Sequence, residues 1–370
     1  MTHPVIGWEQ NDPVPDGHQF NHFLQNRNGR LHLKNIDLLS FFEKENDDTD
    51  KPSYLPSPLE IVYLPLIEQK IEMMETVFKE AARNTEYDGQ FLYAYASKAN
   101  AAEEVIRTTL RAGAHHEMSS TVDVDIARIM IHRGLLKPDK YIFCNGFKPA
   151  NSDYASNIIR LRQDHEKLVP IIEDMTEIQS FLASGHQFDV GLRQKSYGNN
   201  KTEDEMNNAN SRFGFDIDTI WKAADYIAAA PNLKLTTFHN MVGSQLVDPD
   251  GFVDRLRPGI EVYARLRQRH PHLHIFNFGG GMPVGMTLDF DFDYGYFAEH
   301  LLSVIKEACQ RYGVPVPDVM GEFGRYTTSE HGVHVFKVML EKENGSELPW
   351  YIINGSVMSS FPDTWALSEH

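Results

Sequence analysis

The chain has 370 residues, of which 41% are hydrophobic and 24% are charged, and its formal net charge is −17 at pH 7. These values are typical of a soluble globular protein with one large domain and part of another, and the negative charge argues against a nucleic-acid partner. No apolar run is long enough to span a membrane, and the polar N-terminus does not resemble a signal peptide. The two cysteines, Cys144 and Cys309, lack metal-ligand spacing, so we expect a cytoplasmic protein without a membrane partner.

The predicted elements start with an irregular stretch over residues 1–60, in which only 29–33 alternates like a strand. A long amphipathic helix is predicted at 66–83, and strand and helix patterns then alternate regularly. Strands are expected at 91–96, 114–117, 140–144, 168–172, 188–193, 233–238, 274–278 and 317–321. Helices are expected near 101–112, 121–133, 151–164, 175–184, 216–230, 249–269 and 293–312, with starts at Ser120 or Thr121, Asp153 and Pro249.

This alternation predicts a (β/α)8 barrel, since eight such units occupy about 250 residues in that fold. A doubly wound open sheet is the alternative, but it needs fewer strands and a switch point that the pattern does not contain. After Arg325 the pattern changes, and residues 332–340 alternate like a strand of a separate β domain. We therefore expect a barrel at 61–325 and a discontinuous β domain from 1–60 and 326–370, which has too few strands to be complete.

Polar residues follow the predicted strands, where barrel enzymes keep their catalytic groups. Lys98 ends the first apolar run, and a desolvated lysine there could form a Schiff base with an aldehyde cofactor. The alternative is a lysine whose amine simply reaches solvent. The residues after the later strands are Glu117, Asn145, Asp174, Arg193, His239, the glycines Gly279, Gly280 and Gly281, and Glu322 with Arg325.

The triple glycine lets backbone N–H groups approach an anion, and late barrel loops are the usual phosphate site of this fold. Ser244 and Arg325 could add phosphate donors, although Arg325 could equally form a surface ion pair. Glu322 could keep a pyridine nitrogen protonated and so make the ring an electron sink, or it could be a structural acid paired with Arg325. Arg193 could bind a phenolate oxygen or pair with a nearby acid. His239 could equally be a structural, hydrogen-bonded histidine.

Taken together, these residues resemble the fold-type III pyridoxal-phosphate decarboxylases, which are alanine-racemase-like barrel enzymes. The resemblance covers about residues 55–365 and is carried, in family order, by Tyr95–Asn100, Ser211–Phe215, His239 with Val242–Gln245, the triple glycine, and Glu322–Arg325. Within that group the chain looks most like the biosynthetic arginine decarboxylases. The stretches that favour this branch are Tyr87–Gly89, Cys144–Lys148, Ile172–Ile178 and Ser360–Ala366.

The resemblance implies a role for each matching residue. Lys98 would bind the cofactor aldehyde covalently with Glu117 close by, Arg193 would approach the cofactor phenolate, and Glu322 would pair with the pyridine nitrogen. The phosphate would be held by Ser244, Gly280, Gly281, Gly324 and Arg325, with Gly279 as a further cofactor contact. The implied reaction is pyridoxal-phosphate-dependent decarboxylation of a basic L-amino acid, arginine to agmatine in polyamine biosynthesis, with Asp363 as a candidate substrate-binding acid.

The chain also departs from the family pattern. The position of the histidine that stacks on the cofactor in many relatives is Met241 here, so either His239 takes that role or a thioether packs there. The usual proline of the last-strand motif is Phe323, and Asn354–Gly355 lacks the acid of the ornithine branch. The Cys-Asp segment and the late tyrosine of relatives are missing. The chain is therefore expected to be a C-terminally truncated or shortened member of a compact branch.

Other activities remain open from the sequence. They are decarboxylation of diaminopimelate, ornithine, lysine or carboxynorspermidine, racemisation, non-catalytic pyridoxal-phosphate binding, and sugar-phosphate chemistry without that cofactor. The family implies a homodimer or higher homo-oligomer with shared active sites. Mg²⁺, which some arginine decarboxylases require, has no visible ligand set in the sequence.

Overall fold

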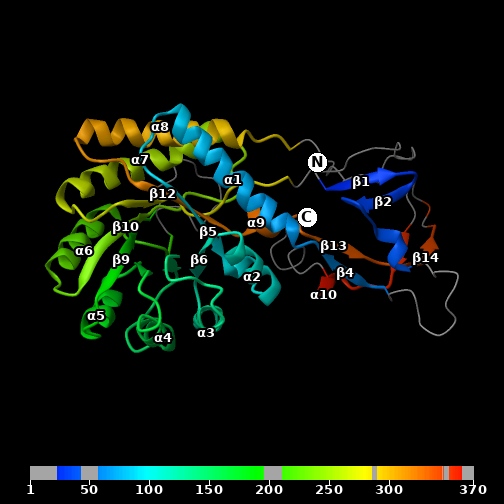
Figure 1. The fold of residues 1–370 in the computed structure, drawn as a ribbon, viewed down its shortest axis with the longest axis horizontal. Coiled ribbons are helices and arrows are strands. Elements are labelled where there is room, and N and C mark those ends of the chain that lie inside the picture. The colour runs from blue at the N-terminus through cyan, green and yellow to red at the C-terminus, as the bar shows by residue number, and fades with distance from the viewer. Residues whose placement is uncertain are drawn as a thin grey trace. The chain divides into compact units, whose positions relative to one another are not determined.

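The structure is a computed structural model that describes residues 23–42, 57–195, 211–285, 290–343, 345 and 350–360. The chain divides into two compact units, each of which is described here by itself (Figure 1). The larger unit consists of Leu64–Val284 and Asp291–Ser329, and the remaining segments form the smaller one. The candidate substrate residue Asp363 lies outside the described residues.

The larger unit contains a closed barrel of eight parallel strands, which confirms the predicted fold. The barrel closes where β12 pairs with β5, from Val319 opposite Phe91 to Phe323 opposite Tyr95. The strands are β5 (Phe91–Ala96), β6 (His115–Met118), β7 (Ile142–Cys144), β8 (Leu168–Ile172), β9 (Phe188–Arg193), β10 (Leu233–His239), β11 (Ile275–Asn277) and β12 (Asp318–Phe323).

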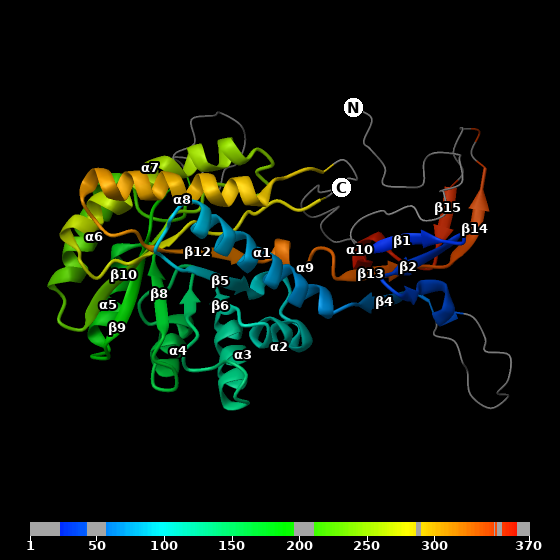
Figure 2. The same ribbon diagram turned by 45° about the horizontal axis from the view of Figure 1, so that its top comes forward.

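Helices surround the barrel on its outside (Figures 1 and 2). They are α1 (Pro65–Asn84), α2 (Glu103–Arg111), α3 (Thr121–His132), α4 (Asp153–Leu161), α5 (Met175–Ala183), α6 (Ile217–Ala229), α7 (Pro249–Arg269), α8 (Tyr294–Tyr312) and α9 (Arg325–Thr328), with the 3-10 turn η2 (Ser97–Ala99) after β5. Three of these helices begin where the sequence suggested. Their capping oxygens come from the preceding residues Ser120, Ser152 and Asp248, because an N-cap lies just outside the helix.

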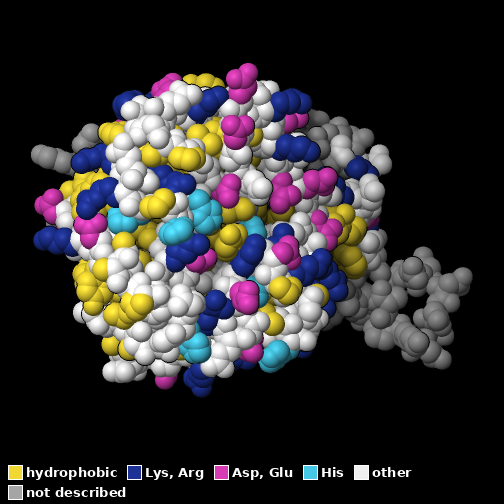
Figure 3. Space-filling view, turned by 60° about the vertical axis from the view of Figure 1, so that its left-hand side comes forward, with side chains coloured by type: hydrophobic (Ala, Val, Ile, Leu, Met, Phe, Trp, Pro, Cys, Tyr) yellow, Lys and Arg dark blue, Asp and Glu magenta, His cyan; other side chains and the backbone are white. Residues whose placement is uncertain are grey.

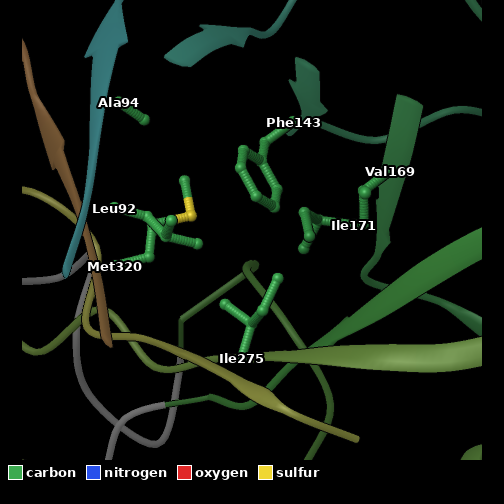
Figure 4. Close-up of a cluster of buried hydrophobic side chains, with 7 residues drawn as sticks. All are labelled: Leu92, Ala94, Phe143, Val169, Ile171, Ile275 and Met320. Carbon is green, nitrogen blue, oxygen red and sulfur yellow. The ribbon is translucent and has the colours of Figure 1, made fainter. Parts of the chain in front are cut away.

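Inward-pointing side chains fill the barrel (Figure 4). The cluster consists of Leu92, Ala94, Phe143, Val169, Ile171, Ile275 and Met320, and all of them are buried. Alternate residues of a strand point to opposite faces, so these side chains meet inside while Tyr93 and Tyr95 point outward. Tyr93 then bonds Thr327 through its hydroxyl at 2.8 Å. The packed interior leaves only the ends of the barrel for polar chemistry.

The smaller unit consists of short antiparallel sheets. A three-stranded sheet contains β1 (Leu24–Arg27), β2 (Arg30–Leu33) and β3 (Ile36–Asp37), followed by the 3-10 helix η1 (Leu38–Phe42). Asn28 and Gly29 join β1 to β2 with φ of 52° and 75°, the left-handed backbone that a two-residue hairpin requires. Two further pairs are β4 (Leu59–Val62) with β13 (Gly332–Val335) and β14 (Val338–Lys342) with β15 (Trp350–Ile353), and a short helix α10 (Val357–Ser360) follows.

The single strand expected at 332–340 is wrong in one respect, because the segment forms two strands. β13 ends at Val335 and β14 begins at Val338, and each pairs with a different partner. Continuous alternation along the chain cannot reveal a change of partner, since it reports only which side chains share a face.

The surface mixes charges of both signs. On the face drawn in Figure 3, acidic and basic side chains are interspersed with hydrophobic ones. Among the described residues, no helix combines the length and apolar character needed to cross a membrane.

Candidate active site

Five polar side chains lie on the inward face of the barrel at the carboxyl ends of its strands. Glu322 lies two residues beyond Met320 on β12, and Asn277 two residues beyond Ile275 on β11. The registers then place His239 beside Asn277 and Arg193 beside His239. Glu117 pairs with Phe143, another interior residue. Because side chains alternate with a period of two, all five belong to the layer above the hydrophobic core.

Asn145 joins two buried carboxylates. Its Nδ2 donates to Glu117 Oε1 at 2.8 Å and to Glu322 Oε1 at 2.9 Å. Asn277 Nδ2 donates to the same Glu322 oxygen at 2.7 Å. Tyr154 fixes Asn145 in turn, since its hydroxyl donates to the Asn145 carbonyl at 2.9 Å. The last strands and the turn after β7 thereby form one hydrogen-bonded layer.

The two carboxyl groups differ in acidity. Burial raises the pKa of Glu117 to about 7, against the opposing effect of Lys98. Burial alone would also raise the pKa of Glu322, but His239, Lys98 and the amides of Asn145 and Asn277 together lower it. A hydrogen bond or a positive charge favours the ionised form of a carboxyl group. Glu322 is therefore the charged member of the pair at neutral pH.

His239 is fully enclosed at the end of β10. Its Nε2 lies 3.7 Å from Glu322 Oε2, which is longer than a hydrogen bond. Burial lowers the pKa of His239 to about 4, so the ring is neutral at pH 7. Within the part of the chain that the structure describes, neither ring nitrogen has a hydrogen-bond partner. The alternative of a hydrogen-bonded structural histidine therefore finds no support among these residues.

Lys98 lies in η2, directly after β5, and its side chain is exposed. Its charge acts on the pKa of Glu117, of Glu322 and of His239. The amine thus lies within electrostatic range of three side chains of the inward layer. The expectation that Lys98 is desolvated differs from this structure, in which the turn after the strand carries the amine out of the packed barrel.

The glycine turn after β11 leaves no room for side chains. A Cβ at Gly280 would lie 2.6 Å from the Glu322 carbonyl oxygen, and one at Gly281 would lie 2.0 Å from the Gly243 carbonyl oxygen. A Cβ added at Gly279 would lie 3.2 Å from His239 Nε2 and 2.7 Å from Met241 Sδ. Only glycine fits at these three positions, where the loop that contains Ser244 lies against the turn.

Gly324, directly after the last strand, packs closely against the turn η2 that contains Lys98. A Cβ at Gly324 would lie 2.9 Å from that of Ala99 and 3.4 Å from the Ala96 carbonyl oxygen, on either side of Lys98. Arg325 follows as the first residue of α9 and is half-buried. Lysine, last-strand motif and glycine turn, which are far apart in the sequence, thus meet at one end of the barrel.

Arg193 pairs with an acid that the sequence reasoning did not select. Its Nη1 lies 3.2 Å from Glu173 Oε1, and the side chains are 13% and 5% exposed, so the pair is largely withdrawn from water. The guanidinium carbon lies 4.7 Å from the centre of the Phe213 ring. Of the two roles considered for Arg193, pairing with an acid is therefore present in the structure.

A cavity of about 770 Å³ opens beside this pair, at the ends of β8 and β9. Asp174 borders it but caps α5 with its carboxylate, as does Asp216 at α6. The lining residues are Phe147, Glu173, Asp174, Met175, Lys195, Ser211, Arg212, Phe213, Gly214, Phe215, Asp216 and Thr219.

The residues at this end fit a pyridoxal-type cofactor. Glu117 Oε2, Asn145 Oδ1 and the His239 nitrogens are buried and lack hydrogen-bond partners within the described ranges, which is costly unless a ligand completes them. The side-chain-free glycine turn suits a phosphate, the ionised Glu322 suits a protonated ring nitrogen, and Lys98 offers the amine. No cluster of three or more His, Cys, Asp or Glu residues that could hold a metal occurs in the described part.

Residues 68–329 match the family described as "Pyridoxal-dependent decarboxylase, pyridoxal binding domain". The chain belongs to this family. The resemblance inferred from the lysine, glycine and last-strand motifs is thereby confirmed.

Curated relatives include the biosynthetic arginine decarboxylase of Klebsiella pneumoniae, which is 24% identical over 293 residues, 75% of this chain and 46% of that enzyme. The Yersinia pestis enzyme of the same name is 24% identical over 316 residues, 81% and 47% of the two chains. The chain therefore spans about half the length of these relatives.

Solved structures of two kinds of decarboxylase have a fold similar to that of this chain. A diaminopimelate decarboxylase from M. jannaschii superposes with a TM-score of 0.72 at 21% identity, over 90% of this chain and 74% of that one. The biosynthetic arginine decarboxylase of Campylobacter jejuni gives a TM-score of 0.68 at 19% identity, over 88% and 54%. At these identities the likeness concerns the fold and does not choose between the substrates.

Proposed function

We propose that the chain binds pyridoxal 5'-phosphate at the carboxyl end of the barrel and contributes to the decarboxylation of a basic L-amino acid, with arginine as the first candidate. The observation that carries the proposal is the buried, ionised Glu322 in the same layer as Glu117, within electrostatic range of the amine of Lys98. The cofactor supplies the electron sink that makes loss of the carboxylate possible. A similar fold, 18% identical with a TM-score of 0.64, holds this cofactor.

The residues of this chain divide the remaining work. Lys98 offers the amine that holds the cofactor and that an incoming amino acid would displace. Glu322, kept charged by its amide donors, holds a proton on the ring nitrogen. The glycine turn with Ser244 and Arg325 would hold the phosphate, and Arg193 would approach the phenolate oxygen. His239, neutral and without hydrogen bonds to described residues, would stack its ring on the cofactor ring.

The choice of substrate is supported less directly. The curated relatives named above act as arginine decarboxylases by name, whereas two similar diaminopimelate decarboxylase structures hold L-lysine. Both kinds of ligand have a basic distal group. The cytoplasmic location, the homo-oligomeric state and the substrate contact of Asp363 stay predictions.

Reduction with borohydride tests cofactor binding separately from turnover. The purified chain is mixed with pyridoxal phosphate, reduced and digested, and we expect the modified peptide to contain Lys98. Lys98→Arg keeps the positive charge but should lose the label, whereas Lys222→Ala, a change at an exposed lysine of α6, should retain it. Labelling spread over many lysines, or equal in the Lys98→Arg variant, contradicts the proposal.

Carbon dioxide release then tests the reaction. Arginine, lysine, ornithine and diaminopimelate are each supplied to the cofactor-loaded chain, and we expect release from arginine. Release from diaminopimelate alone would keep the reaction and refute the substrate. Specific labelling of Lys98 without release from any of the four would refute decarboxylation by this chain on its own.

A further inference from the structure

A lysine and a glutamate form a completely buried ion pair outside the group of residues assigned to the cofactor. Lys148 follows β7, Glu177 lies in the first turn of α5, and both side chains have no exposed area. Their Nζ and Oε2 atoms are 3.0 Å apart. Lysine and glutamate are rarely buried to this extent, and then only when they are paired. The presence of a buried lysine–glutamate pair at this place therefore needs an explanation.

The pair is tied to backbone on both sides. Lys148 Nζ also donates to the Ile171 carbonyl at 2.6 Å and to the Gly146 carbonyl. Glu177 Oε1 accepts the backbone N–H of Glu173 at 3.1 Å. The ion pair therefore fixes the turn after β7, the end of β8 and the residue that follows β8.

That residue completes a continuous series of contacts. The backbone of Glu173 is held by Glu177, and its carboxylate pairs with Arg193 at 3.2 Å. Arg193 in turn lies over the Phe213 ring. Every link from Lys148 to Arg193 is thus a contact between buried or nearly buried groups, without an exposed step.

Stability alone is a weak reason for such a pair. The desolvation of two charges offsets most of their attraction, and an apolar pair of similar volume is often equally stable or more so. An apolar pair, however, could not bond the carbonyls of Gly146 and Ile171 or the N–H of Glu173. The charges are needed for these backbone contacts.

We propose that Lys148 and Glu177 are positioning residues that fix the turn after β8, so that Glu173 holds the guanidinium of Arg193 in one orientation toward the cofactor site. The inference rests on the proposed function for what Arg193 contacts. The orientation of Arg193 itself can be tested without the cofactor.

The main variant replaces the pair by apolar residues of similar size, Lys148→Met with Glu177→Leu. Modification of arginines by a dicarbonyl reagent, mapped by mass spectrometry on the cofactor-free protein, reports how well Arg193 is protected. We expect Arg193 to react several-fold faster in the double variant, while exposed Arg269 on α7 reacts as before. Unchanged protection of Arg193 in a folded double variant would show that the pair only fills the core.

The second readout is cofactor affinity. Residues that orient a ligand-binding side chain commonly change affinity by about tenfold or more when removed, and we expect the dissociation constant of pyridoxal phosphate to rise by about that factor. In a protein that already carries Glu173→Gln, the Lys148→Met and Glu177→Leu changes should raise the dissociation constant little further. The Glu173–Arg193 contact through which they act is already weakened there. A further rise of about tenfold in the Glu173→Gln protein would refute the proposal that the buried pair acts through Glu173.

Glu173→Gln alone covers the case in which the double variant does not fold. It leaves the buried pair intact and weakens only the last contact, so Arg193 should again react faster and bind the cofactor less tightly. Normal protection and normal affinity in this variant would overturn the proposal. Faster reaction of Arg193 in a protein whose wild type binds no pyridoxal phosphate would leave the positioning role standing and refute the proposed function instead.

Discussion

At the residue scale, the two carboxyl groups joined by Asn145 show how one layer of a barrel creates unlike acids. Both Glu117 and Glu322 are buried, but Glu322 accepts two amide donors on one oxygen, whereas Glu117 accepts one. Hydrogen bonds to the ionised form favour it, and burial opposes it. The layer therefore places a group that holds a proton near pH 7 beside one that stays charged.

Glu117→Gln should change how the stability of the cofactor-free chain depends on pH. Because burial raises the folded pKa from 4.5 to about 7, the stability linked to protonated Glu117 is complete below pH 4.5 and is lost as the pH rises through 7. Glutamine does not ionise, so the variant should be more stable than wild type at pH 8, by up to about 3 kcal/mol, and similar at pH 4.

Urea unfolding from pH 4 to pH 8.5 measures this difference. Glu104→Gln, a change at an exposed acid in the first turn of α2, serves as the control and should leave the pH profile as it is. A Glu117→Gln profile parallel to that of wild type would show that Glu117 does not hold a proton in the folded chain.

Gly281→Ala tests the side-chain-free turn against a matched glycine. Gly281 and Gly313 both have positive φ, 85° and 64°, but an added Cβ meets the Gly243 carbonyl only at Gly281 and finds open space at Gly313. We expect Gly313→Ala to cost about 1 kcal/mol for its backbone alone and Gly281→Ala to cost about 1–3 kcal/mol more, with weaker pyridoxal-phosphate binding. Equal unfolding free energies for the two variants would mean that the turn relaxes easily.

Sequence reasoning selected residues that follow predicted strands, and the structure brings them to one end of the barrel. It did not select residues whose contacts depend on which strands are neighbours. Lys98, His239 and Glu322 stand at the ends of apolar runs, and their combination with the other motifs suggested a role that no single position established. Asn277 was not selected. Its only signal in the sequence is its spacing of two residues from Ile275, which places both side chains on the same face of a short strand. Glu173 gave no comparable signal, because its contact with Arg193 requires knowing that β8 and β9 are neighbours with their ends level.

At the element scale, the regular alternation of apolar runs and amphipathic segments predicted most of the barrel. The bounds of β5, β8 and β9 agree with the predicted ranges, since buried parallel strands are nearly continuous apolar runs. Glu177 escaped notice for a related reason. It lies one turn before Phe181 on the buried face of α5, where a charged residue looks like a break in the pattern unless its partner is known.

Ser152→Ala should weaken the start of α4. The Ser152 hydroxyl oxygen accepts the N–H of Ala155 at 3.2 Å, one of the helix-end donors that has no partner within the helix. Removing the cap should lower the free energy of unfolding by about 1 kcal/mol, and Ser152→Thr should retain most of it. Ser156→Ala, an exposed position inside the same helix, is the control and should be neutral or slightly stabilising in urea unfolding, since alanine is the better helix former. An unchanged Ser152→Ala protein would show that this helix does not depend on its cap.

At the scale of the whole molecule, the two units differ in how their strands are protected. The barrel has no free edge, and its core side chains are almost entirely buried. In the smaller unit, β14 and β15 pair only with each other among the described strands, and their large apolar side chains are exposed, with Leu340 at 56% and Trp350 at 60%. An isolated two-stranded pair is marginal in water.

Hydrogen exchange of the full chain should therefore separate the two units. Opening costs little where few apolar contacts are broken, so amides of β14 and β15 should exchange at least about a hundredfold faster than those of β5 and β12, which close the barrel. Mass spectrometry of peptides from these strands measures the ratio, and dilution of the protein is the control. Slow exchange of β14 and β15 that is independent of concentration would show that the chain itself covers this sheet, whereas protection that fades on dilution would show that a second copy does. Either result would contradict a solvent-exposed hairpin, and the second would agree with the homo-oligomer that the family resemblance implies.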